Sequence, residues 1–368
     1  MRILMFADYP HGSMIKGPSV HTLALAEGLR DREDIELCIV DFKGRSAKRE
    51  SLRVADNIQV NIVPVQFPLT YYNILTGYRA YANEINSFKP DLVHFFDSHQ
   101  VNALRRTGQI PHVLTVHGHF FNEHGLVSQS LKRRLSRSTY FKESFSGLER
   151  ADNLILLSRY SSNEVHPYTR ARHHFLSQPI LNEIYALPRN VDPSTVLSVG
   201  NIARVKGTDR LVEAHAFFPK GTRTLIAGSI RDKTFYNELT RTIEKQNIEG
   251  IHFLGALERS GIYHALSTAS VVACPSRLEN MPYALLEALA AGIPCVSFDV
   301  GGIGEFLTDG VNGFLPGDQQ GFVKAITTLI EDEPLRHKMS NNARISVQGN
   351  RSGPVCEELA KIYREILN

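Results

Sequence analysis

Short apolar runs rich in β-branched residues alternate with helix-like segments along most of the chain. The first run covers residues 3–7 and closes on Asp8, so it predicts a buried strand and is too short for a signal-peptide core. Comparable runs predict strands at residues 35–40, 92–96, 112–116, 153–157, 195–199, 224–227, 252–254, 270–274 and 295–298. Because strands separated by helices form parallel sheets covered on both faces, we predict an α/β fold.

The alternation of strands and helices is interrupted near the middle of the chain. Residues 179–193 contain three prolines and scattered polar residues with little periodicity, which is typical of a linker. A chain of 368 residues can bury two ordinary cores, and a new strand pattern starts at Ser194. We therefore predict two doubly wound domains, residues 1–185 and 186–353, and a C-terminal helical segment, residues 354–368, that packs back across the first domain.

The amino-acid composition argues against several classes of protein. No stretch approaches the ~18 consecutive apolar residues of a membrane-spanning helix, so we expect a soluble or peripheral protein. The four cysteines lack C-x-x-C spacing and indicate buried thiols of a cytoplasmic protein, with neither a zinc site nor a disulfide framework. A net charge of +3 without a nucleic-acid-binding motif predicts no nucleic-acid partner.

Positive charge is nevertheless concentrated in two places in the first half of the chain. Residues 126–142 contain no Asp or Glu and carry the basic residues Lys132, Arg133, Arg134, Arg137 and Lys142. A second cluster comprises Lys43, Arg45, Lys48, Arg49 and Arg53. A solvated helix face is the simpler explanation of such clusters, and peripheral contact with an anionic membrane is the alternative.

The most informative segment covers residues 275–292. A buried strand ends just before it and a helix starts near Pro282, with Asn280 as the expected N-cap. This order places Glu279 at the carboxyl end of a sheet strand, in the crevice where ligands of open α/β sheets bind. Amides at the start of the helix, near Met281, Pro282 and Tyr283, would favour a ligand phosphate or oxygen there. Asn280, Met281 and Pro282 are therefore candidate ligand-binding residues.

Glu287 lies about one turn inside the same helix, among alanines and leucines. A carboxylate on such an apolar stretch needs a specific hydrogen-bonding partner, and ribose hydroxyls are one. Two glutamates eight residues apart are common by chance, so a solvent-exposed loop glutamate at 279 and an ordinary helix glutamate at 287 remain the alternative.

The residues around these glutamates carry a family resemblance. The pattern Pro-Ser-x-x-Glu-Asn-x-Pro-x-x-x-x-Glu-Ala-x-Ala-x-Gly-x-Pro resembles the E-x7-E nucleotide-sugar motif of retaining glycosyltransferase family 4. The resemblance is dense over residues 194–317, and it implies the GT-B fold, in which two Rossmann-like domains face a central cleft. It also implies that the second domain binds the donor and the first the acceptor, with Glu279 at the donor sugar and Glu287 at the ribose.

Residues 197–207 resemble the strand and loop with which the family brings an arginine and a lysine to the donor diphosphate. The resemblance assigns these roles to Arg204 and Lys206, because two cations would stabilise the charge of the leaving group. The commonest family form has its arginine directly after the glycine, where this chain has Asn201, so Lys206 is the closer match. A surface turn with solvated charges is the alternative.

The first half offers further matches. Gly17 precedes an apolar helix and matches the family's glycine-rich loop, where a small residue lets the chain approach phosphates. Gly12 and Gly17 do not form the G-x-G-x-x-G motif of a dinucleotide-binding site. The pattern of residues 112–120 predicts a strand followed by a His-Gly-His turn, and His117 aligns with the histidine that in family members lies against the transferred sugar. His94, His99 and His119 are further candidates, and a hydrogen-bonded structural role is the alternative for each.

The resemblance implies a retaining transfer of a sugar from a UDP- or GDP-sugar to a hydroxyl acceptor in polysaccharide, glycolipid or glycoconjugate biosynthesis. The basic clusters of the first half are compatible with a lipid-linked acceptor and with a cytoplasmic protein peripheral to the inner face of the membrane. The chain contains no Asp-x-Asp motif, so neither a metal nor another cofactor is expected. The alternatives are a GT-B sugar-nucleotide epimerase and a non-catalytic nucleotide-sugar-binding module.

Overall fold

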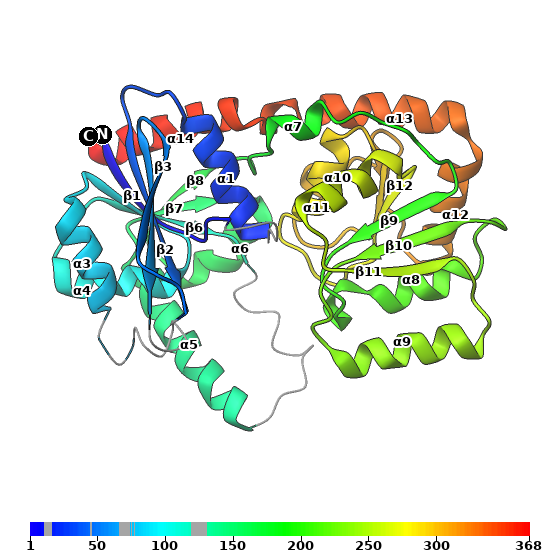
Figure 1. Ribbon diagram of the computed structural model, residues 1–368, viewed down its shortest axis with the longest axis horizontal. Coiled ribbons are helices and arrows are strands. Elements are labelled where there is room, and N and C mark those ends of the chain that lie inside the picture. The colour runs from blue at the N-terminus through cyan, green and yellow to red at the C-terminus, as the bar shows by residue number, and fades with distance from the viewer. Residues whose placement is uncertain (11–16, 45, 66–73, 75, 77, 119–130) are drawn as a thin grey trace.

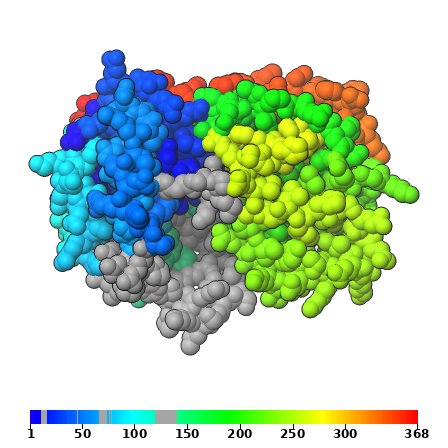
Figure 2. Space-filling view, viewed as in Figure 1, coloured from blue at the N-terminus to red at the C-terminus, as the bar shows by residue number. Residues whose placement is uncertain are grey.

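The computed structural model describes residues 1–10, 17–44, 46–65, 74, 76, 78–118 and 131–368, with the backbone alone described for residues 131–139. These residues form two α/β domains that lie side by side, and the C-terminal part of the chain runs along one edge of both (Figure 1, Figure 2).

The first domain is built on an eight-stranded sheet in the order β3-β4-β2-β1-β5-β6-β7-β8. Neighbouring strands are parallel except β3 and β4. The strands are β1 (Arg2–Phe6), β2 (Glu36–Lys43), β3 (Glu50–Ala55), β4 (Ile58–Pro64), β5 (Leu92–Phe95), β6 (His112–Val116), β7 (Asn153–Leu156) and β8 (Arg172–Phe175). Its helices include α1 (Gly17–Leu29), α3 (Arg79–Phe88), α4 (Leu104–Thr107), α5 (Leu131–Arg150) and α6 (Arg159–Val165).

The second domain is built on a six-stranded parallel sheet in the order β11-β10-β9-β12-β13-β14. The strands are β9 (Thr195–Val199), β10 (Arg223–Ala227), β11 (Ile251–Gly255), β12 (Val271–Cys274), β13 (Cys295–Ser297) and β14 (Gly313–Phe314). The helices are α8 (Thr208–His215), α9 (Lys233–Lys245), α10 (Arg259–Thr268), α11 (Tyr283–Ala290), α12 (Gln319–Glu331) and α13 (Glu333–Ser346). The strand order reverses between β9 and β12, which opens a crevice at their carboxyl ends.

The central strands of both sheets are buried on both faces. In β1, Ile3 and Met5 pack into one core and Leu4 and Phe6 into the other, because successive side chains of a strand point to opposite faces. In β9, Val196 and Leu197 divide in the same way between the two cores of the second domain. This burial explains why the central strands read as continuous apolar runs.

All the strands expected from the apolar runs are present, and β6 and β9 have the predicted bounds. The pattern of apolar runs did not predict the strands β3, β4, β8 and β14. The alternation of Ile58, Val60 and Ile62 was a usable signal for β4, whereas β8 reads Arg-His-His-Phe and β14 is only two residues long.

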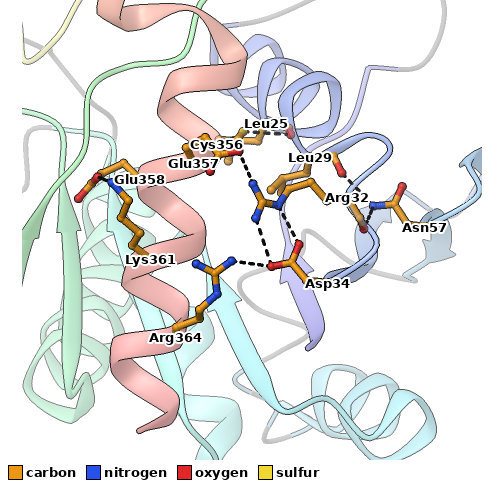
Figure 3. Close-up of polar contacts among 10 residues, drawn as sticks. All are labelled: Leu25, Leu29, Arg32, Asp34, Asn57, Cys356, Glu357, Glu358, Lys361 and Arg364. Atoms are coloured by element: carbon orange, nitrogen blue, oxygen red, sulfur yellow. Dashed lines mark hydrogen bonds and ion pairs between the residues drawn. The ribbon is translucent and has the colours of Figure 1, made fainter.

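The C-terminal helix α14 (Ser352–Leu367) packs on α1 and contributes Val355, Leu359 and Tyr363 to the first-domain core, which confirms that it crosses back. Figure 3 shows the polar contacts that fix it: Arg32 bonds Glu357 at 2.6 Å, and Arg364 bonds Asp34 at 2.6 Å. Arg32 also bonds Asp34, and these guanidinium groups lower the pKa of the Asp34 carboxyl to about 2.

The chain crosses between the domains twice, and the two crossings are hydrogen-bonded to each other. The Ile180 amide donates to the Asn350 carbonyl at 2.7 Å, and the Ser352 amide donates to the Ile180 carbonyl at 3.2 Å. The predicted linker contains a short helix, α7 (Asn182–Tyr185), whose Ile184 packs into the second-domain core. The boundary between residues 185 and 186 stays a prediction.

In the part of the chain described above, no helix has the length and apolar character needed to cross a membrane.

Candidate functional site

The candidate site lies where the two domains meet, at the carboxyl ends of β9 and β12 in one sheet and of β6 and β7 in the other (Figure 1). The loop after β12 reaches the first domain directly, because the Asn280 side chain donates to the carbonyl of His117 at 3.1 Å. Residues that are distant in sequence therefore face one another across this crevice.

Glu279 follows β12 and is largely buried, with 7% of its surface exposed. Its Oε1 accepts from Lys206 Nζ at 2.7 Å and from Ser276 Oγ at 2.7 Å. Both of these bonds reach Oε1 and neither uses Oε2, so a ligand hydroxyl could donate to Oε2. The sequence reading did not name Ser276, although its place three residues before Glu279 in the motif was visible.

Lys206 reaches Glu279 because the loop after β9 packs tightly against the loop after β12. Gly207 follows it with φ of 65°, and a Cβ there would lie 2.0 Å from the carbonyl oxygen of Pro275. Only glycine fits both the conformation and the space. The Lys206 side chain remains 32% exposed, so its ammonium group can contact both the carboxylate and a ligand in the crevice.

The structure does not bring Arg204 to this pair. Its guanidinium forms an ion pair with Glu238 on α9 and lies 4.9 Å from the ring centroid of Phe235. The predicted contact of Arg204 with a diphosphate would require this side chain to leave Glu238. Its role stays a prediction.

Asn280 is not the N-cap of α11, and that prediction was wrong: Pro282 is the N-cap, and the helix begins at Tyr283. The Asn280 side chain is used between the domains, because Oδ1 accepts from Ser158 Oγ at 2.6 Å while Nδ2 donates to His117. Met281 and Pro282 are half-buried at the start of the helix. Since proline has no N–H, Pro282 cannot supply one of the expected amides.

Glu287 is half-buried on α11. Burial raises the pKa of its carboxyl to about 7, and the positive charge of Arg259 opposes that rise. Arg259 itself is paired with Glu183 on α7 and donates to the hydroxyl of Tyr263 at 2.6 Å. Glu287 is therefore a carboxyl whose charge changes near neutral pH, and a hydrogen-bonding ligand would stabilise its ionised form.

His117 directly follows β6, and its ring is stacked on Phe96 at a centroid distance of 5.1 Å and lies 4.5 Å from the ring centroid of His21. Burial lowers its pKa to about 4, so the imidazole is neutral at pH 7. Its buried Nε2 has no hydrogen-bond partner among the described residues. A ligand hydroxyl is a group that could pair with it. His21, which is fully buried, was not foreseen in this cluster.

The other histidine candidates differ in environment. His94 is fully buried and bonded to Tyr363 and Thr115, at 2.7 and 2.6 Å, which is a structural role. His99 is buried and paired with Asp97 at 2.8 Å. His119 lies outside the described residues, as do Arg45 and the side chains of Lys132, Arg133, Arg134 and Arg137.

Gly17 is the first residue of α1 and faces the second domain. A Cβ at this position would lie 3.9 Å from Cδ2 of Tyr283, an ordinary contact distance, so protein packing does not itself require glycine there. No group of three or more His, Cys, Asp or Glu residues suited to hold a metal ion occurs in the described part of the chain.

Comparison with known proteins gives matches in both halves. A model described as glycosyl transferases group 1 matches residues 182–346, and one described as glycosyltransferase family 4 matches residues 15–175. An uncharacterized glycosyltransferase of Methanocaldococcus jannaschii is 27% identical over 94% of this chain and 92% of its own length. The glycogen synthase of Mycobacterium tuberculosis is 27% identical over 70% of this chain and 64% of its own length.

Solved structures resemble the whole chain. The sucrose-phosphate synthase of Thermosynechococcus elongatus has a TM-score of 0.82 at 19% identity and covers 99% of this chain and 98% of its own. An Anabaena protein in complex with UDP and glucose has a TM-score of 0.77 at 20% identity and covers 99% of this chain and 100% of its own. WaaG, a glycosyltransferase involved in lipopolysaccharide biosynthesis, has a TM-score of 0.70 at 18% identity and covers 99% of each chain.

Proposed function

The chain belongs to the family 4 glycosyltransferases and has their GT-B fold, and from that membership we propose a retaining, metal-independent transfer of a sugar from a nucleoside-diphosphate sugar to a hydroxyl acceptor. The observation that carries the proposal is the Lys206–Glu279 pair at the switch point of the second sheet. A cation for the leaving diphosphate and a carboxylate oxygen for the sugar lie side by side there.

We assign the residue roles from the family resemblance together with this pair. Lys206 stabilises the diphosphate, with Arg204 as a second cation, while Glu279 Oε2 and His117 Nε2 bind hydroxyls of the transferred sugar. Glu287 binds the ribose, and the start of α11 together with Gly17 lines the donor site. The acceptor oxygen attacks the anomeric carbon on the face that the diphosphate leaves, and a diphosphate oxygen takes up the acceptor proton. No carboxylate has to act as a nucleophile in this scheme.

The substrates are proposed at the level of class. The second domain binds the donor and the first the acceptor. UDP is the nucleotide to test first, because the Anabaena neighbour was solved with UDP and glucose. WaaG is named for lipopolysaccharide biosynthesis and the Mycobacterium tuberculosis relative is named a glycogen synthase, which supports a glycan or lipid-linked acceptor. A cytoplasmic protein with peripheral membrane contact through the basic clusters would fit such an acceptor.

The direct test is incubation with UDP- and GDP-sugars and a panel of hydroxyl acceptors, with and without EDTA. We expect a glycoside with retained anomeric configuration and an unchanged rate in EDTA. An epimerised nucleotide sugar would support the epimerase instead, and nucleotide binding without any turnover would support the binding module. A thermal-shift screen with UDP, GDP and ADP identifies the nucleotide base of the donor, because a ligand that binds only the folded state raises the melting temperature of the protein.

Glu287 predicts a pH dependence of donor binding. Below a pH of about 7 the free enzyme carries this carboxyl largely protonated, and it then accepts ribose hydrogen bonds less well. The donor KM should therefore fall as pH rises from 6 to 8, roughly within one unit of that pKa. Measured KM profiles should show this step in the wild type and a flat, weaker profile in Glu287→Gln.

The free energy of unfolding of Glu287→Gln provides a control for the environment assigned to Glu287. The pKa of Glu287 is raised from 4.5 to about 7 on folding, so between these values the folded state holds a proton that the unfolded state has lost. Stability therefore decreases through this group as pH rises across that window. Glu287→Gln should gain stability relative to the wild type over the same window, and a loss instead would contradict the assigned buried environment.

A further inference from the structure

Two sets of hydrogen bonds join the first domain to the second beside the candidate donor site. Ser158, which follows β7 and caps α6, donates from Oγ to Asn280 Oδ1 at 2.6 Å. Glu305, in the second domain, accepts from the first two backbone N–H groups of α6, at 2.8 and 3.0 Å. Both contacts therefore end on the same short stretch of the first domain.

The hydrogen-bonding groups of the Asn280 side chain are both committed to the first domain. Its oxygen accepts from Ser158, and its nitrogen donates to the carbonyl of His117. With 4% of its surface exposed, the residue is buried between the domains. It directly follows Glu279 in the chain, so fixing its side chain also fixes the backbone that carries the Glu279 carboxylate.

The glycine pair that follows β13 makes this approach possible. A Cβ at Gly301 would lie 1.5 Å from the carbonyl oxygen of Glu279, and one at Gly302 would lie 2.9 Å from Ser158 Cβ. The Gly302 amide also donates to the Asn280 carbonyl at 3.0 Å. These glycines are thus explained by close packing of the two loops and of the first domain.

We propose that Ser158, Asn280 and Glu305 form an interdomain latch that positions Glu279 against His117 in the closed enzyme. These side chains are positioning residues, because they act through Glu279 and His117. The inference rests on the proposed function, since closure matters for a donor that must be kept from water. A few hydrogen bonds suit this purpose, because they hold the cleft shut during transfer and still permit opening for product release.

The test compares Glu305→Ala and Asn280→Ala with the matched control Glu331→Ala, which removes an exposed glutamate of α12. In both latch variants kcat for transfer should fall about ten-fold or more, as expected when hydrogen bonds to a charged or buried group are lost. The Kd for UDP should stay at the wild-type value, and the fraction of donor hydrolysed instead of transferred should rise. The control should match the wild type in all three.

X-ray scattering of the ligand-free proteins adds a readout that needs no activity. The latch predicts a larger radius of gyration in both variants than in the wild type, with far-ultraviolet circular dichroism unchanged. Wild-type kcat in both variants, or an equal loss of kcat and UDP affinity, would overturn the latch and leave the proposed function standing. If the wild type itself transfers no sugar, the proposed function fails, and an unchanged radius of gyration would then overturn the latch on its own.

Discussion

Replacing Lys206 with alanine is expected to lower kcat about 10²–10³-fold, the loss typical of removing one fixed group that stabilises developing charge. As the glycosidic bond breaks, the diphosphate gains negative charge beside the anomeric carbon. The Lys206 ammonium is held 2.7 Å from Glu279 Oε1 and is still partly exposed to the crevice, so it is preorganised for that charge. Since the charge is greater in the transition state than in the bound donor, the effect should fall on kcat more than on KM.

Steady-state kinetics on folded protein measure this prediction, and Lys361→Ala is the matched control. Lys361 also forms a lysine–glutamate pair, with Glu358 at 3.0 Å, but both side chains are more than half exposed on α14. Its loss should change neither kcat nor stability appreciably, as is usual for exposed pairs. Near-wild-type turnover by a folded Lys206→Ala protein would remove Lys206 from the proposed mechanism.

The variant Arg204→Ala tests whether Arg204 stabilises the leaving diphosphate as we propose for Lys206. If the guanidinium leaves Glu238 to bind the diphosphate, kcat should fall as it does for Lys206. If Arg204 keeps the contacts seen here with Glu238 and Phe235, its loss should affect mainly the stability of the contact with α9. Measuring kcat and the melting temperature of one variant therefore distinguishes the two roles.

The α/β fold could be predicted from the sequence because most central strands are buried on both faces. Such strands appear in the sequence as continuous apolar runs. Edge and short strands such as β8 and β14 lack that signal, because β8 is largely polar and partly exposed and β14 is only two residues long. The family pattern likewise placed Glu279 and Lys206 in adjacent loops, because the carboxyl ends of β9 and β12 must meet at the switch point.

The hydrogen-bond partners of side chains across the domain boundary could not be predicted from the sequence. Asparagine is a favoured N-cap residue, so the local sequence predicts a helix cap at Asn280. In the folded protein its amide instead bonds Ser158 and His117, which lie more than a hundred residues away. The family resemblance of its loop assigns Arg204 to the diphosphate, whereas in the structure its side chain pairs with Glu238 on α9. Such contacts depend on tertiary geometry that local patterns do not encode.

Replacing Glu279 with glutamine is expected to lower kcat about 10–100-fold, as for the loss of a charge-assisted hydrogen bond. The substitution keeps the shape of the side chain, and its amide oxygen can still accept from Lys206 and Ser276. The amide nitrogen then takes the place of Oε2, so the group that we propose accepts from sugar hydroxyls becomes a donor. Kinetics with the donor, together with the Kd for the free nucleoside diphosphate, should show lost turnover and retained nucleotide binding.

The double variant Lys206→Ala/Glu279→Gln tests whether the two residues act as a pair. Because Nζ and Oε1 are in direct contact, removal of either partner already disturbs the other, and the combined loss should be smaller than the product of the two single losses. Ser276→Ala serves as the companion, since it removes the second donor to Oε1 and leaves both charges in place. Losses that multiply independently would mean that Lys206 and Glu279 act on separate parts of the donor, and the ion pair seen here would then be only a resting arrangement.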